Sequence, residues 1–191
     1  ELAVTPANRK AVSVLQRFAD HRNAFLLESM EGGENWGRYS FVGIDPQLLF
    51  EADHSTGGQG SLEALRDVYQ DLRAAEIAGL PRFCGGAVGF IGYEAIGEFE
   101  RMPEPKDSAP GVRAVSRFLK ADRLIVFDNV RHTVKIVICT RPGDADSAAS
   151  AYEQAVTELE AIASTLGNPA PAGRAETYPG ADIESNMTAE A

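Results

Sequence analysis

Two polar residues at the end of an apolar segment are the residues best suited to chemistry in this sequence. In the stretch FLLESMEGGENWGRYSF (residues 25–41), the apolar run FLL is typical of a buried strand, and it leads directly into Glu28 and Ser29. A carboxylate can bind the ammonium group of a ligand, and a hydroxyl with the free amides of a turn can bind a carboxylate. Beside an apolar wall, these groups would form a pocket for an amino acid.

The same stretch has plainer interpretations. Glu28 and Ser29 are also consistent with a solvated strand end. Arg38, which follows the glycines, would contact a ligand or form a structural salt bridge. Trp36 would stack on a ligand or cover the core. Residue spacing alone leaves these alternatives open.

No catalytic or metal-binding constellation is visible in the sequence. His21, His54 and His132 lie in polar segments without the spacing of metal ligands, and no cysteine joins them. Nothing pairs a nucleophile with a base, and there is no phosphate-binding or dinucleotide fingerprint. The residues therefore predict one small-molecule pocket and no catalytic site.

The composition is that of a soluble globular protein. The 191 residues are 44% hydrophobic and 24% charged, and the net charge of −10 argues against nucleic acid or an anionic membrane as the main partner. Cys84 and Cys139 lie beside apolar segments, so we expect buried, reduced thiols and a cytoplasmic protein. No segment approaches the ~20 apolar residues that span a bilayer.

Apolar spacing and turn residues predict the elements that would position the pocket. Helices are expected from Thr5-Pro6 to about residue 20, from a Ser61 cap to about residue 76, and over 144–166. In the last helix, the side chains spaced for packing are Tyr152, Val156, Leu159 and Ile162.

Strands are predicted over 24–29, 39–44 and 47–52, and over 85–94, where glycines indicate close approach of a backbone or ligand. Residues 119–140 are typical of two long strands joined in a hairpin through DNVRH. This order predicts an α+β fold with mostly antiparallel sheets and about three packing helices.

We place that domain at residues 1–167. Residues 168–191 have no periodic apolar face and are expected to form a linker.

Several motifs resemble the amino-terminal region of anthranilate synthase component I. The stretches LLESMEGGENWGRYSFVGIDP and GGAVGFIGYEAIGEFE are similar to the two signatures of that region, and Thr5-Pro6 is similar to its opening. IESNMTAEA, at 183–191, resembles the entry into the chorismate-binding domain of the family. The resemblance runs in order from about residue 5 to residue 190.

The resemblance implies a division of labour. In the family, a carboxyl-terminal domain binds chorismate and Mg²⁺, adds ammonia and eliminates pyruvate to leave anthranilate, and a glutamine amidotransferase, component II, supplies the ammonia. The chain would stop where that domain begins. We therefore expect it to be inactive alone and to bind no cofactor itself.

The resemblance also implies a role for the polar strand end. In the family, the Leu-Leu-Glu-Ser element belongs to the tryptophan feedback site, so Glu28 and Ser29 would contact L-tryptophan and Arg38 would lie in the same pocket. The catalytic domain would supply the other half of that site. The second signature departs from the family, because Tyr93 and Glu94 are not followed by the usual arginine; both are expected to be structural or domain-contact residues.

Two alternatives remain open at this point. The related 4-amino-4-deoxychorismate synthase component I has the same architecture and serves the folate pathway. A stand-alone module that senses amino acids is an alternative from another functional class.

Overall fold

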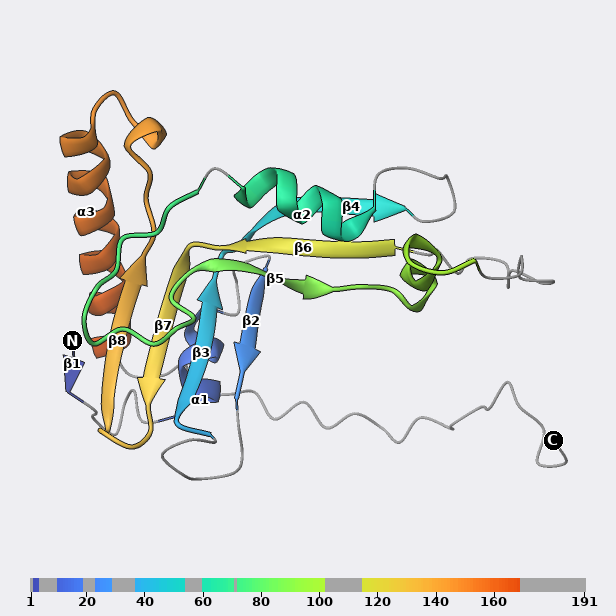
Figure 1. Ribbon diagram of the computed structural model, residues 1–191. Helices are drawn as coiled ribbons and strands as arrows, with labels where there is room; N and C mark the ends of the chain where they lie inside the picture. The colour runs from blue at the N-terminus through green and yellow to red at the C-terminus, as the bar shows by residue number, and fades with distance from the viewer. Residues whose placement is uncertain are drawn as a thin grey trace, which may run out of the picture.

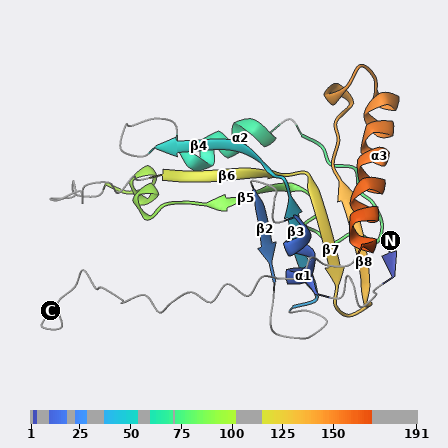
Figure 2. The same ribbon diagram turned by 180° about the vertical axis from the view of Figure 1, so that it is seen from behind.

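The computed structural model describes residues 2–3, 10–18, 23–28, 37–53, 60–70, 72–101 and 115–168. Within this part of the chain, two antiparallel sheets and three α-helices confirm the predicted α+β fold (Figure 1). The smaller sheet extends to one side of the larger one, away from the long carboxyl-terminal helix, in both views (Figures 1 and 2).

The larger sheet has five strands in the order β1-β8-β7-β3-β2, and every neighbouring pair is antiparallel. Its strands are β1 (Leu2–Ala3), β2 (Ala24–Leu27), β3 (Tyr39–Ile44), β7 (Arg123–Asp128) and β8 (Thr133–Ile138). The hairpin predicted through DNVRH is confirmed: β7 turns into β8 there, and His132 adopts a positive φ of 52°. The two-residue β1 was missed, because so short a strand has no periodicity to detect.

The smaller sheet has three strands in the order β4-β6-β5. They are β4 (Gln47–Asp53), β5 (Gly86–Phe90) and β6 (Val115–Ala121). The prediction of one long strand before DNVRH was wrong, because the chain breaks at Asp122 and passes from β6 in one sheet to β7 in the other. The break predicted at Asp45-Pro46 is confirmed; Asp45 has a φ of 45°, and the chain passes there from β3 to β4.

The strand predicted over 85–94 is shorter than expected. It ends at Phe90, and residues Tyr93–Glu98 form a 3-10 helix, η3. The close approach predicted for its glycines is confirmed at Gly89, where a Cβ atom would lie 2.0 Å from the carbonyl oxygen of Arg117 on β6.

The helices begin and end differently from the sequence prediction. They are α1 (Ala11–Leu15) with the 3-10 turn η1 (Gln16–Phe18), α2 (Ser61–Tyr69) and α3 (Ala148–Gly167), which follows the 3-10 turn η4 (Pro142–Asp144). Thr5-Pro6 lies outside the described residues, but Lys10 is extended, so the first helix starts only at Ala11.

The second helix differs at both ends. Gly60 is its N-cap, and the Glu98 carboxylate accepts a hydrogen bond from the Ser61 main-chain nitrogen at 2.8 Å. A carboxylate from η3 thus takes the capping role predicted for Ser61. The helix ends at Tyr69 rather than near residue 76.

Helices α1 and α3 cover one face of the larger sheet and enclose the main core. Val14, Val42, Ile125 and Leu166 are almost completely buried there, and burying each such side chain contributes about 1.5–3 kcal/mol. The Arg17 guanidinium donates hydrogen bonds to the carbonyl oxygens of Thr165 and Leu166, which satisfies acceptors at the end of α3.

The packing face predicted for α3 was largely wrong. Ile162 is buried, but Tyr152 is 68% exposed and Val156 and Leu159 are more than one third exposed. Ala151 and Leu166 are buried instead, so the face that packs on the core runs through Ala151, Ile162 and Leu166.

Among the described residues, no helix has the length and apolar character needed to span a membrane.

Candidate functional site

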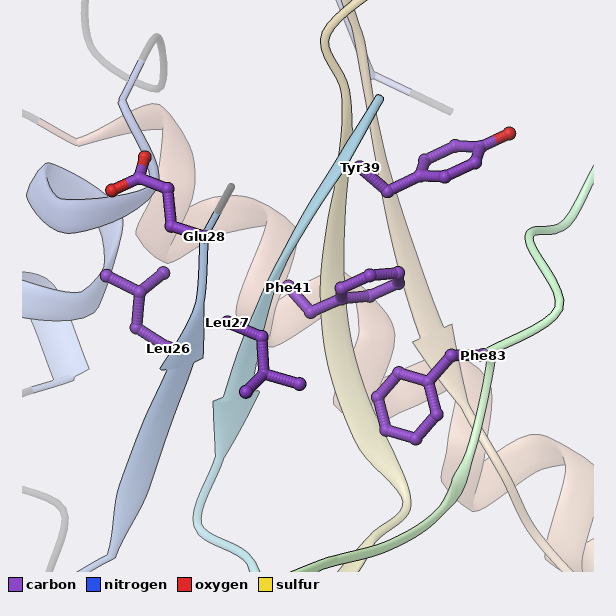
Figure 3. A pocket seen from close by; sticks show the side chains of 6 residues that line it. All are labelled: Leu26, Leu27, Glu28, Tyr39, Phe41 and Phe83. Atoms are coloured by element: carbon purple, nitrogen blue, oxygen red, sulfur yellow. The ribbon is translucent and has the colours of Figure 1, made fainter. Parts of the chain in front are cut away.

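A hollow of about 430 Å³ lies at the end of β2, where the polar strand end was predicted to bind a ligand. Six side chains line it and are shown in Figure 3: Leu26, Leu27, Glu28, Tyr39, Phe41 and Phe83. Five of the six are apolar or aromatic, so the wall suits a flat hydrophobic group.

The register of two strands places most of this wall. Leu27 of β2 lies opposite Phe41 of β3, and Tyr39 is two residues from Phe41 on the same face. Phe83 comes from the irregular chain between α2 and β5, and its ring meets that of Phe41 edge-on at 5.2 Å between centroids. The Tyr39 and Phe41 centroids are 6.1 Å apart. The aromatic rings thus pack on one another and hold the wall in place.

The lining comes from both sides of β2, which is an edge strand of the larger sheet. Figure 3 shows Leu26 and Glu28 on one side of the strand and Leu27 with the aromatic rings on the other. This follows from the alternation of side chains along a strand. The hollow therefore extends around the end of β2, with the Glu28 carboxylate at its edge and exposed to solvent.

Of the two roles considered for Arg38, the structure shows the salt bridge, and its partner is Asp128. Its Nη2 lies 2.8 Å from Oδ2 of Asp128, and its Nε donates to both carboxylate oxygens at 3.1 and 3.3 Å. The guanidinium carbon also lies 4.8 Å from the centroid of the Tyr39 ring. Arg38 does not line the hollow. It contacts the ring of Tyr39, and Tyr39 does line the hollow. The contact of Arg38 with a ligand stays a prediction.

The partner of Arg38 is a buried carboxylate with several donors. The Asp128 side chain is only 2% exposed and also accepts hydrogen bonds from the main-chain nitrogens of Val130 and Arg131. Burial raises the pKa of Asp128, but these hydrogen bonds and the Arg38 charge outweigh burial and hold the pKa below its ordinary value. Asp128 is therefore ionised at neutral pH and anchors both Arg38 and the β7–β8 turn.

Other predicted residues are not brought to the hollow or lie outside the described part of the chain. Ser29, Trp36, His21 and His54 are outside it, so their roles stay predictions. His132 is exposed on the β7–β8 turn.

In the second signature, Tyr93 is 81% exposed on η3, which leaves the expectation of a structural or domain-contact role untested. The side chain of Glu94 lies outside the described residues.

The sequence interpretation missed the aromatic wall. Tyr39 and Phe41 carried a usable signal, since they alternate with Ser40 and Val42 and so share one face of a strand. Phe83 carried none, because its contact with Phe41 joins residues far apart in the chain.

No group of three or more potential metal ligands occurs among the residues that the structure describes.

Comparisons with known proteins identify the family. The chain is 39% identical to anthranilate synthase component 1 of Streptomyces coelicolor over 149 residues, which cover 78% of this chain and 27% of that protein. It is 33% identical to the probable anthranilate synthase component 1 of Schizosaccharomyces pombe over 171 residues, or 87% of this chain and 34% of that protein.

A solved structure of anthranilate synthase component I from Streptococcus pneumoniae has a TM-score of 0.48 and 19% identity, covering 85% of this chain and 37% of that one. No protein-family model matches the chain. The chain spans about a third of the length of the curated relatives that it matches. By its sequence identity to these relatives, the chain belongs to the anthranilate synthase component 1 family.

Proposed function

We propose that this chain is the amino-terminal, regulatory part of an anthranilate synthase component I. The whole enzyme would convert chorismate and glutamine-derived ammonia to anthranilate and pyruvate in tryptophan biosynthesis, in the cytoplasm. A chorismate-binding domain would hold Mg²⁺ and perform the reaction, and component II would supply the ammonia. Residues 1–167 would form the regulatory domain and 168–191 the linker. The end of α3 at Gly167 supports that boundary.

The observation that carries the regulatory role is the aromatic hollow with a carboxylate at its edge. L-tryptophan needs an apolar wall for its indole, an acceptor for its ammonium group and donors for its carboxylate. Leu27, Phe41 and Phe83 offer the wall, and Glu28 offers the acceptor. Ser29 and the glycine-rich residues that follow it in the sequence are proposed to donate to the carboxylate.

The hollow is open at the edge of β2, which supports a site completed by another domain. Leu27 is 42% exposed although it lines the hollow. A second wall from the chorismate-binding domain would remove this surface from water. Tryptophan would then favour the domain arrangement in which both walls meet and, through differential affinity, disfavour the arrangement competent for catalysis.

The test uses full-length component I with component II, assayed for anthranilate formed from chorismate and glutamine as tryptophan is increased. We expect inhibition of the wild type. Ser29→Phe should be active but insensitive, because a ring at that position would fill the site. Glu28→Gln should need about tenfold more tryptophan, which corresponds to the loss of one charge-assisted hydrogen bond. Glu160→Gln is the matched control, since Glu160 is an exposed carboxylate on α3.

The outcomes separate the parts of the proposal. Anthranilate formation without any effect of tryptophan would leave the enzyme assignment standing and remove the effector site. Formation of aminodeoxychorismate in place of anthranilate would assign the chain to the related folate enzyme. Tryptophan binding with no chorismate-dependent product would favour a sensing module.

A further inference from the structure

Cys84 and Cys139 lie side by side although they are 55 residues apart in the sequence. The Cys139 thiol is 3.0 Å from the carbonyl oxygen of Cys84. Gly85 makes this approach possible, because a Cβ atom there would lie only 2.6 Å from the Cys139 sulfur. The expectation that both thiols are buried was wrong: both are free, Cys84 is partly exposed and Cys139 is exposed.

One cysteine lies at the end of a strand and the other in the chain between α2 and β5, where the described residues form no helix or strand. Cys139 directly follows β8, and its main-chain nitrogen donates to the Asp122 carbonyl oxygen at 2.8 Å, so its position is fixed by the larger sheet. Cys84 lies close to the end of the chain between α2 and β5, two residues before β5 begins at Gly86. In the described part of that chain, main-chain hydrogen bonds are few, and Lys135 holds it through the Gly79 carbonyl oxygen at 2.7 Å.

We propose that Cys84 and Cys139 form a reversible intramolecular disulfide that tethers the segment carrying Phe83 to the end of β8. The sulfur of Cys139 already lies within hydrogen-bonding distance of the Cys84 main chain. A disulfide requires the two sulfurs to meet at about 2.05 Å, so the Cys84 sulfur would have to reach the Cys139 sulfur that already lies beside its own main chain. Where disulfides do form in cytosolic proteins of mesophiles, they are usually transient and redox-sensing.

The oxidant is a low-molecular-weight disulfide such as oxidised glutathione. The thiolate of one cysteine attacks a sulfur of the oxidant, which forms a mixed disulfide and releases one small thiol. The thiolate of the second cysteine then attacks the protein sulfur of the mixed disulfide and releases the second small thiol. The protons lost by the two cysteines are taken up by the released thiols, so the two cysteines are oxidised and the small disulfide is reduced.

The disulfide would act on the aromatic wall of the hollow. Phe83 is the residue next to Cys84 and packs edge-on against Phe41. A covalent link at Cys84 restricts the segment that carries Phe83 and so fixes one wall. An effect of oxidation on tryptophan affinity rests on the proposed function, whereas formation of the disulfide does not.

The test is a redox titration of the folded 191-residue chain in glutathione buffers, followed by acid quenching, alkylation and mass spectrometry. We expect one monomeric oxidised species that carries no glutathione and has lost two hydrogen atoms. The same titration in urea is the control for proximity. The native chain should form the disulfide at an effective thiol concentration at least tenfold above that of the unfolded chain.

Two variants and one further readout complete the test. Cys84→Ser and Cys139→Ser should each give only a mixed disulfide with glutathione. Arg82 is exposed beside Cys84, and the tether should slow its cleavage by trypsin in the oxidised chain at least severalfold. Equal effective concentrations in native and unfolded chains, or mixed disulfides and dimers alone in the wild type, would overturn the proposed pair. Unchanged cleavage at Arg82 with the disulfide formed would overturn the tether.

Discussion

The ion pair between Arg38 and Asp128 offers the sharpest quantitative prediction. It connects the start of β3 with the end of β7, and the Arg38 guanidinium carbon lies 4.8 Å from the centroid of the Tyr39 ring in the aromatic wall. Arg38→Met removes the cation but keeps an unbranched side chain, and Asp128→Asn removes the charge but keeps an oxygen for the turn amides. The two variants and their combination form a double-mutant cycle.

The expected magnitude follows from the burial of the two partners. Breaking a fully buried pair from one side costs about 3–5 kcal/mol, whereas an exposed pair contributes about 0–1 kcal/mol. Asp128 is 2% exposed and Arg38 29%, so Arg38→Met leaves a buried carboxylate with only two main-chain donors. We expect Arg38→Met to lower the free energy of unfolding by about 2–3 kcal/mol.

Asp128→Asn should lower the free energy of unfolding by less than Arg38→Met does. Arg38 is partly exposed and can be hydrated, so we expect a loss of about 1–2 kcal/mol. The double variant should cost about 1–2 kcal/mol less than the sum of the single variants, because each single variant already removes the interaction.

The assay is equilibrium urea unfolding at neutral pH with linear extrapolation, and unchanged slopes are the sign that only stability has changed. Arg117→Met is the matched control. Its guanidinium is half exposed and lies 3.7 Å from the Glu51 carboxylate, so it should cost less than about 1 kcal/mol. If Arg38→Met costs no more than Arg117→Met, or if the cycle is additive, the pair does not anchor the strands and the reasoning from burial is refuted.

Further predictions concern packing, backbone approach, pH and redox state. Gly89→Ala should lower the free energy of unfolding in urea by about 3 kcal/mol or more, because its Cβ would overlap a main-chain oxygen on β6. In the control Gly97→Ala the new Cβ meets nothing within 4 Å, so the change should be less than about 1 kcal/mol. Equal losses in the two variants would contradict the close packing of β5 on β6. Leu166→Ala should lose about 2–5 kcal/mol, since the side chain is 1% exposed in the main core, and a loss below about 1 kcal/mol would mean that α3 is not docked there. The pKa of Asp128 is lowered in the folded state, so its ionised form stabilises the fold above about pH 4, and this contribution is lost as the pH falls through the folded pKa. The difference in unfolding free energy between wild type and Asp128→Asn should therefore shrink as the pH falls. A difference that stays constant down to about pH 2 would contradict the direction of the pKa shift. The proposed disulfide closes a loop of about 55 residues, so oxidation should raise the free energy of unfolding by up to about 4 kcal/mol in the chain-entropy estimate. The measurement is the urea midpoint, which should rise on oxidation of the wild type and stay unchanged in Cys84→Ser.

Local sequence patterns determined several elements because their causes are themselves local. Alternating apolar residues identified β3, and the turn after it was marked by Asp45-Pro46. The polar turn DNVRH identified the β7–β8 hairpin. The end of the strand before Glu28 was predicted correctly, because polar residues and glycines stop an apolar run, but the expectation that this strand is buried was wrong: β2 is an edge strand with no fully buried residue.

Other features depend on contacts between distant residues and could not be predicted locally. At Asp122 the chain passes from one sheet to the other, and this break depends on which strands pair with β6 and β7. The face of α3 was misjudged because several residues of this Ala-rich helix have apolar spacing, and only the docked core shows that Ala151, Ile162 and Leu166 form the buried side. The family, by contrast, was read correctly from short motifs, and sequence identity over most of the chain confirms it.

The sequence by itself determined the fold class, the strand end that carries Glu28 and the family, since composition, periodicity and motifs are properties of the chain alone. The tertiary structure decided what surrounds that strand end. It paired Arg38 with Asp128 across 90 residues, placed Phe83 against Phe41 and brought Cys139 to Cys84. These contacts arise when strands from distant parts of the chain pair and their side chains compete for the same space, and no local pattern encodes which distant partner a side chain will meet.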